Sequence, residues 1–231
     1  MFQSWRQLLF AHWPVPADAL RPLVPRELVL EEFEGSAWVG LTPFRLTGLH
    51  ARFLPPVPGL SEFPEMNLRT YVRFKGKPGI HFFSLDAGSR LAVLGARIGY
   101  RLPYYTADMH VEAGTDGWVR YRSRRQDATG AEFMARYRPE GDVFQAEAGS
   151  LEHFLSERYA LYSVLRNGTI LRGEIHHRPW PLQRAEAIVE TNSVASAHRI
   201  SLPDGPPLLH YSERQDTLVW PPVIAIGGAD W

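Results

Sequence analysis

The sequence predicts one β-rich α+β domain over residues 1–231. Short segments of alternating apolar and polar residues recur along the chain, which is the pattern of half-buried strands. Nineteen glycines and nineteen prolines separate these segments, and only three segments carry helix signals. About ten strands and about three short helices imply a curved sheet or a barrel, and such folds often run to about 200–250 residues as one unit.

The first part of the chain has three expected features before its best hairpin. Residues 1–15 form an apolar, aromatic opening, and prolines bracket a short helix within residues 16–25. Residues 38–41 and 43–46 are predicted as strands separated by turn residues. Four prolines within residues 53–64 exclude regular strand pairing there, so we expect a loop over the rim of the fold.

The clearest hairpin joins predicted strands at 67–74 and 80–85 through the Gly/Pro turn at 75–79. Ser89 is a good helix cap, and the apolar spacing that follows predicts a helix over 89–100 that ends before Pro103. A second helix is expected at 150–157, behind Ser150. The remaining strands are expected at 104–111, 117–124, 131–138, 159–165, 168–177, 186–194 and 207–213.

Charge and composition exclude several classes of function. The 25 basic and 25 acidic residues balance to a net charge of zero, so the positive field that phosphate binding requires is missing and no nucleic-acid partner is expected. The same balance leaves little repulsion between copies, which favours a homodimer. No stretch of 18 apolar residues and no cleavable leader is seen, so we expect a cytoplasmic protein with no membrane partner.

Motifs for metals and cofactors are also missing from the sequence. There is no cysteine, which excludes disulfides, thiolate nucleophiles and Cys-ligated metals. Neither a dinucleotide fingerprint, a P-loop nor a GxSxG elbow occurs. His176 and His177 are adjacent on a predicted strand and therefore point to opposite faces, which is poor geometry for a metal site. We expect no cofactor and no metal.

Lysine is scarce, and this restricts amine chemistry. Lys75 and Lys77 are the two lysines of the chain. Both lie in the predicted turn, where solvated charges are the expectation. Imine formation requires a neutral primary amine, which proteins obtain by desolvating a lysine or placing it beside another cation. Neither lysine is predicted to meet that condition.

Several motifs in chain order resemble the YqjF-like family, also called domain of unknown function 2071, of the acetoacetate decarboxylase-like superfamily. They are AHWPVP at 11–16, WVG at 38–40, EMNLRTYV at 65–72, KPGIHFFSLDA at 77–87, LPYY at 102–105 and HYS at 210–212. The resemblance implies a curved antiparallel sheet that closes into a cone-like barrel with an internal pocket. It implies no particular reaction, so the function must be argued from the site.

One segment resembles the catalytic segment of acetoacetate decarboxylases. Ala96, Arg97 and Pro103 match the family's glycine–arginine pair and its proline, while Tyr104 and Tyr105 occupy the two lysine positions. The first of those lysines forms the Schiff base with the β-keto acid. A phenol cannot form an imine, so the resemblance implies that this route is lost here.

Two arginines are candidates to hold the carboxylate of a small organic acid, namely Arg69 on an alternating strand and Arg97 at a helix end. The alternative for Arg69 is a pair with Glu65 or another carboxylate, or exposure to water. Asn67 and Glu65 share the alternating strand and are further ligand-binding candidates.

Tyr104 and Tyr105 are expected on opposite faces of one strand, with one in the pocket and the other outside or at a dimer contact. Tyr105 is a ligand-binding candidate. Tyr104 and His12 are the catalytic candidates, and His210 is a further ligand-binding candidate. For each histidine the alternative is a core residue bonded to a backbone carbonyl.

Two functions therefore remain open. The first is a barrel that binds a small acidic or carbonyl-bearing molecule; if it is an enzyme, it is a lyase, hydratase or isomerase that needs no lysine and uses Tyr104 or His12 as proton donor. The second is a non-catalytic sensor or structural dimer, in which the arginines and tyrosines form a buried polar network.

Overall fold

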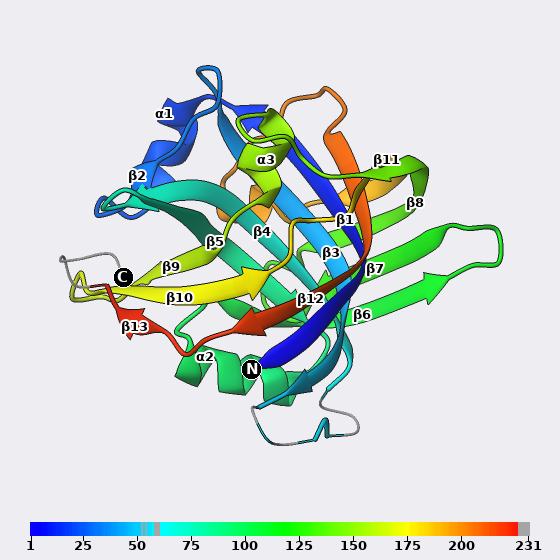
Figure 1. The fold of residues 1–231 in the computed structure, drawn as a ribbon, viewed down its shortest axis with the longest axis horizontal. Helices are drawn as coiled ribbons and strands as arrows, with labels where there is room; N and C mark the ends of the chain where they lie inside the picture. The colour runs from blue at the N-terminus through cyan, green and yellow to red at the C-terminus, as the bar shows by residue number, and fades with distance from the viewer. Residues whose placement is uncertain (52, 54, 58–60, 226–231) are drawn as a thin grey trace.

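The computed structural model describes residues 1–51, 53, 55–57 and 61–225. In that part of the chain, thirteen strands form one sheet in the order β13-β10-β9-β5-β6-β7-β8-β11-β12-β1-β3-β4-β2 (Figure 1). The first strands are β1 (Phe2–Val15), β2 (Val29–Leu30), β3 (Ala37–His50), β4 (Phe63–Phe74), β5 (Lys77–Ala87) and β6 (Tyr104–Ala113). They are followed by β7 (Val119–Arg125), β8 (Glu132–Phe144), β9 (Ala160–Val164), β10 (Ile170–His177), β11 (Leu182–Asn192), β12 (Leu208–Val219) and β13 (Val223–Ile224).

Three short α-helices accompany the sheet, as predicted: α1 (Ala17–Leu20), α2 (Arg90–Gly99) and α3 (Leu151–Ser156). The expected caps are present, because the side chains of Ser89 and Ser150 accept hydrogen bonds from the main-chain nitrogens of Ala92 and His153. No helix within the described residues combines the length and the apolar composition that a bilayer crossing requires. The β-rich fold class with three short helices is confirmed.

The sheet curves so far that its hydrogen bonds run in rings. Pairing of β4 with β5 links strands that are distant in the sheet order, and pairing of β10 with β12 does the same. Two rings result, and both contain the five strands β12, β1, β3, β4 and β5. Most pairs are antiparallel, but β5 pairs in parallel with β6 and with β9, which the purely antiparallel prediction did not include.

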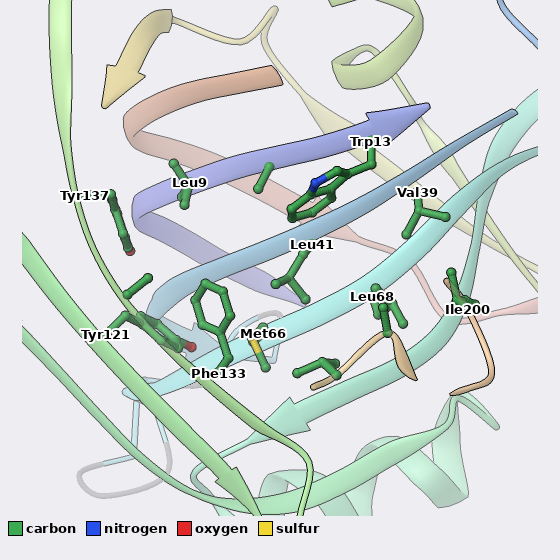
Figure 2. Close-up of a cluster of buried hydrophobic side chains, with 14 of the residues drawn as sticks. Leu9, Trp13, Val39, Leu41, Met66, Leu68, Tyr121, Phe133, Tyr137 and Ile200 are labelled. Carbon is green, nitrogen blue, oxygen red and sulfur yellow. The ribbon is translucent and has the colours of Figure 1, made fainter. Parts of the chain in front are cut away.

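The shared strands have protein on both faces, and β4 shows the consequence. Met66 and Leu68 point into an apolar core that also contains Leu41 of β3, Tyr121 of β7 and Phe133 of β8 (Figure 2). Because strand side chains alternate, Glu65, Asn67 and Arg69 point to the opposite face. A polar row therefore runs along the side of the sheet that faces away from this core.

Gly79 allows the close parallel pairing of β5 with β9. A Cβ atom at this position would lie 2.6 Å from Cε2 of Tyr162 and 2.7 Å from the carbonyl oxygen of Ala160. Both distances are shorter than van der Waals contact, and one of the atoms belongs to the backbone. Only glycine fits this approach, which places Ile80 beside Leu161.

Two predicted boundaries differ from the structure. The strands expected at 38–41 and 43–46 form one continuous strand, β3. Pro43, which cannot donate a main-chain hydrogen bond, lies opposite a register shift in β1 between Arg6 and Ala11, so β3 continues through it. The loop expected at 53–64 ends earlier than predicted, because Phe63 and Pro64 begin β4; residues 54 and 58–60 of that loop lie outside the described residues.

Candidate functional site

A cavity of about 340 Å³ lies on the polar side of β4. Its walls come from β1, β3, β4, β5, β9, β10 and β12, and α2 covers part of it. Most of the lining is apolar, and the largest of these side chains are Trp5, Phe44, Phe63, Phe82 and Trp180. A mostly apolar cavity with a few placed polar groups is the usual form of a small-molecule site.

Glu65, Asn67 and Arg69 all line this cavity. The alternation of β4 places them on one face, and its register with β3 is unbroken along this stretch, from Phe44 opposite Glu65 to Gly40 opposite Arg69. The sequence predicted these three residues as ligand-binding candidates on one strand. The structure brings them together on one wall.

Arg69 is a buried cation without a counterion. The residue is 7% exposed, and its Nη2 donates one long hydrogen bond, 3.4 Å, to the carbonyl oxygen of Leu155. Its Nε has no hydrogen-bond partner among the described residues, and no ion pair to Arg69 occurs among them. Neither the alternative of a pair with Glu65 nor that of exposure to water is seen. A buried unpaired charge is unfavourable, so the site is suited to an anion.

Two further polar atoms beside Arg69 are also unsatisfied. Asn67 and Thr42 are directly opposite each other on β4 and β3, and both line the cavity. Within the described part of the chain, Oδ1 of Asn67 and Oγ1 of Thr42 are buried and have no hydrogen-bond partner. Native proteins satisfy most buried polar atoms, so three such atoms on one wall indicate a polar ligand.

Glu65 and Tyr104 form a neutral pair at the other end of the row. The Tyr104 hydroxyl donates to the Glu65 carboxyl group, with distances of 3.2 and 3.3 Å to its two oxygens. Burial raises the pKa of Glu65 to about 8, although the Tyr104 hydrogen bond opposes this shift. Burial, together with the adjacent Glu65, raises the pKa of Tyr104 well above its usual range. Both groups are therefore mainly protonated at neutral pH.

Arg158 also lines the cavity but already has a carboxylate partner, which it shares with Arg73. Its guanidinium pairs with the buried carboxylate of Glu31, and its Nε donates to the carbonyl oxygen of Phe154 at 2.7 Å. Sequence reasoning missed Arg158, which lies just after α3. Its charge partner is 127 residues away, and no local pattern indicates such a contact.

The two histidine candidates lie outside the set of residues that line the cavity. His12 is buried, and its Nε2 lies 2.6 Å from the hydroxyl of Tyr71. Burial lowers the pKa of His12 well below its usual value, and the nearby charge of Arg69 lowers it further. His210 is buried as well, with its Nε2 3.9 Å from Glu152. The partners of both rings are side chains, so neither has the backbone-carbonyl contact offered as the alternative.

Arg97 and Tyr105 also lie outside the cavity lining. Arg97 is on the exposed side of α2, and its Nε donates to the carbonyl oxygen of Tyr104 at 2.6 Å. The Tyr105 ring lies 4.0 Å from the guanidinium carbon of Arg125. Arg97, the second candidate partner for a carboxylate, is thus exposed and not part of the described cavity lining, which does not support it as a direct ligand of an acid in the cavity. Tyr104 and Tyr105 do take opposite sides of β6, as strand alternation requires.

Both lysines are placed away from the cavity lining. Nζ of Lys77 lies 2.8 Å from each carboxylate oxygen of Glu174, and Nζ of Lys75 lies 5.4 Å from the ring centroid of Phe74. Both remain in the turn region of the β4–β5 hairpin. Among the described residues, no group of three or more His, Asp or Glu side chains could hold a metal ion.

Comparison with known proteins identifies the family. The family described as an uncharacterized conserved protein, DUF2071, matches residues 2–216. The chain belongs to this family. A relative is the uncharacterized protein YqjF of Bacillus subtilis (strain 168), which is 53% identical over 221 residues, covering 96% of this chain and 90% of the relative.

Solved structures with the same fold are acetoacetate decarboxylase-like proteins. The enduracididine biosynthesis enzyme MppR, in complex with pyruvate, matches 96% of this chain and 89% of its own with a TM-score of 0.66 and 11% identity. Acetoacetate decarboxylase from Legionella pneumophila matches 97% of this chain and 87% of its own, with a TM-score of 0.64 and 13% identity. An acetoacetate decarboxylase-like enzyme from Sphingomonas wittichii RW1 gives a TM-score of 0.64 at 13% identity, covering 97% of this chain and 92% of its own. The resemblance expected from the sequence is confirmed at the level of family and fold.

Proposed function

We propose that this YqjF-like protein binds a small organic carboxylate or keto acid in its cavity, without a covalent link, and that Arg69 is the partner of the carboxylate. The supporting observation is the buried, unpaired guanidinium of Arg69. A carboxylate would supply the missing counterion, and a planar guanidinium can bind it through two parallel hydrogen bonds.

The charge of the cavity supports one negative group per ligand. Arg158 is paired with Glu31, and the raised pKa of Glu65 keeps its carboxyl group mainly neutral at pH 7. Among the charged side chains of the described lining, Arg69 is therefore the one without an ion pair, while the terminal ammonium group of Met1, which also lines the cavity, donates to the carbonyl oxygen of Val219. Asn67 and Thr42, with their unsatisfied oxygens, are placed to accept hydrogen bonds from a hydroxyl group or a bridging water.

The placement of the lysines supports a non-covalent mode. An imine requires a neutral primary amine inside the cavity. Lys77 forms an ion pair with Glu174 outside the cavity lining. Tyr104 has a hydroxyl in the cavity. We infer that the Schiff-base route of acetoacetate decarboxylases does not operate here.

The solved neighbour MppR was obtained in complex with pyruvate, a small keto acid. At 11% identity this likeness shows a shared fold. It supports the proposal only in that the same architecture accommodates such a ligand in another protein.

A second candidate function is a lysine-independent lyase, hydratase or isomerase reaction, and the Glu65–Tyr104 contact favours it. Two neutral acids in hydrogen-bond contact inside a cavity can supply a proton to a carbonyl oxygen. Tyr104 is the better placed of the two predicted proton donors, because His12 lies outside the cavity lining. Deuterium exchange at the carbon next to the keto group of an added keto acid, lost in Tyr104→Phe, would support this function.

Thermal shift measurements test the binding proposal. We expect acetoacetate, pyruvate or a similar acid to raise the melting temperature of the wild-type protein, and Arg69→Gln to abolish the rise. The matched control is Arg97→Gln, which removes the exposed arginine and should keep the response. Equal responses in both variants, or none across a broad panel of acids, would refute Arg69 as the binding group.

Borohydride trapping tests the non-covalent mode. We expect no adduct after incubation with acetoacetate and borohydride, with an aldolase of the lysine type as positive control. An adduct mapped to Lys75 or Lys77 would contradict it. The single domain, the cytoplasmic location and the homodimer expected from the sequence remain predictions, and light scattering measures the last of these.

A further inference from the structure

We propose that the cavity is shaped for an elongated monocarboxylate with an apolar body, whose carboxylate binds Arg69 and whose far end places a neutral acceptor, a ketone or hydroxyl oxygen, at Tyr104 and Glu65. The inference rests on the proposed function, which assigns the carboxylate to Arg69. It adds the size and the second functional group of the ligand.

The register of β4 sets the distance between the two ends. Glu65 and Arg69 share one face of an unbroken antiparallel pairing with β3. Four residues of strand separate their Cα atoms by roughly 13 Å at about 3.3 Å per residue. The guanidinium carbon of Arg69 lies 5.2 Å from the ring centroid of Phe10 and 5.8 Å from that of Tyr71, whereas Glu65 is bonded to Tyr104. The two ends of the polar row therefore remain apart.

A ligand that contacts both ends must be longer than a short keto acid, because its carboxylate is held at Arg69 and its acceptor oxygen at Tyr104 and Glu65, across the Glu65–Arg69 span of β4. In acetoacetate a single methylene group separates the carboxylate from the keto group. A chain of several more carbons is needed to bridge Arg69 and Tyr104.

The volume and the walls fit such a body. The cavity of about 340 Å³ lies at the lower end of the range of about 300–1,000 Å³ for pockets that hold drug-sized ligands. Phe82, Leu161 and Ile175 belong to one apolar cluster that lines the cavity, with Phe82 beside Arg69 on the neighbouring strand. A small acid would leave these side chains without contacts, whereas an aliphatic or aromatic body would bury them.

The chemistry at the far end selects a neutral group. Tyr104 and Glu65 can both donate O–H groups, which suit a ketone or hydroxyl oxygen. A second carboxylate would be buried beside Glu65, where no cationic side chain bonds to the Glu65 carboxyl group or the Tyr104 hydroxyl among the described residues, which is unfavourable. Dicarboxylates should therefore bind more weakly than the matched monocarboxylate.

Calorimetric titration with four probes tests the proposal. The probes are acetoacetate, octanoate, octanedioate and the methyl-ketone analogue of octanoate, which keeps the carboxylate and carries a methyl ketone at its far end. We expect octanoate to bind at least about tenfold more tightly than acetoacetate, because its chain buries apolar wall. The methyl-ketone analogue should bind more tightly still, and octanedioate more weakly than octanoate. Arg69→Gln should lose the binding of every probe.

Two sets of variants separate size from acceptor recognition. Gly95→Leu adds a side chain at a position on α2 that lines the cavity. Gly99→Leu is its matched control. Both positions have open space around an added Cβ, but of the two only Gly95 is in the described lining. Gly95→Leu should weaken the binding of octanoate and leave the binding of acetoacetate unchanged, whereas Gly99→Leu should change neither affinity. Tyr104→Phe should remove the advantage of the methyl ketone over octanoate and leave octanoate itself bound.

The outcomes distinguish the two levels of the argument. If acetoacetate binds as tightly as octanoate and both depend on Arg69, the elongated ligand is refuted while the carboxylate site stands. The acceptor end is refuted if octanoate binds but the methyl-ketone analogue binds no more tightly than octanoate. It is also refuted if Tyr104→Phe leaves the tighter binding of the analogue unchanged. If no acid of any length binds, the proposed function itself fails.

Discussion

The hydroxyl group of Tyr104 on β6 lies 3.2 Å from Oε1 of Glu65 on β4. Parallel pairing of β6 with β5, with Tyr104 beside Leu85, sets the position of this side chain. Tyr104 and Glu65 therefore form a neutral hydrogen-bonding pair, and Arg69 is the charged side chain of the described lining that has no ion pair.

The protonation of Glu65 should appear in the pH dependence of stability. Its pKa is raised from 4.5 to about 8 in the folded protein, so between these values the native state holds a proton that the unfolded state has released. The contribution of Glu65 to the free energy of unfolding is therefore complete below about 4.5 and falls as the pH rises through about 8. Urea unfolding across this range measures it.

The matched variant for this prediction is Glu65→Gln, which stays neutral at every pH. The buried histidines and Asp86 also titrate, so the informative quantity is the difference between wild type and variant. The wild type should lose stability relative to Glu65→Gln as the pH approaches about 8. Parallel curves would contradict a buried neutral Glu65.

The ion pair between Asp86 and Arg125 should be needed for folding stability. Nη2 of Arg125 lies 2.8 Å from Oδ1 of Asp86, and both side chains are 1% exposed. Arg125→Leu would leave a buried carboxylate without its partner, and breaking such a pair costs about 3–5 kcal/mol. Chemical unfolding measures the loss. Arg120→Leu, in the exposed pair with Asp116, is the control and should have little effect.

The hydrogen bond between Tyr71 and His12 should also contribute to stability. The Tyr71 hydroxyl is 2.6 Å from Nε2 of His12, and both side chains are buried. Tyr71→Phe leaves the imidazole without this partner and should cost about 1–3 kcal/mol. Unfolding by urea tests this, and Tyr159→Phe, at a partly exposed ring, is the comparison. No loss in Tyr71→Phe would mean that the contact is not formed in solution.

Gly79→Ala should destabilise the protein through a steric clash. The added methyl group would meet the Tyr162 ring and the Ala160 carbonyl oxygen, and overpacking of this kind costs about 1–3 kcal/mol. Thermal unfolding is the measurement. Gly205→Ala, where an added Cβ meets nothing within 4 Å, should be neutral; equal effects of the two changes would argue against the close β5–β9 approach.

The alternation of residues 65–72 was enough to predict the polar row of the cavity. Met66 and Leu68 mark the apolar face of β4, so Glu65, Asn67 and Arg69 had to share the other face. That this second face is buried as well could not be predicted from the strand alone. It follows from the pairing of β10 with β12, which joins residues distant in sequence.

The orientation of the helix α2 could not be predicted from its apolar residues. Leu91, Leu94 and Ile98 are 63%, 55% and 62% exposed, whereas the small residues Ala92, Gly95 and Ala96 line the cavity. An apolar stripe normally predicts the buried face of a helix, and here the stripe is exposed. The spacing predicted the helix, but not the face that adjoins the cavity or the exposure of Arg97.

His12 illustrates a different limit. It lies in a strand whose residues from Leu8 to Trp13 are all buried, so alternation gives no signal of which face adjoins a cavity and which adjoins a packed core. Its hydrogen-bond partner, the hydroxyl of Tyr71 on β4, is 59 residues away, and no local pattern indicates that contact.

A crystal structure of the protein with octanoate tests the central claim most directly. We predict a carboxylate whose oxygens lie within hydrogen-bond distance of the Arg69 guanidinium, with the chain along Phe82 and Leu161 and no covalent bond to the protein. Density for the acid that is centred away from Arg69, or a ligand joined to the Nζ of a lysine, would contradict the account.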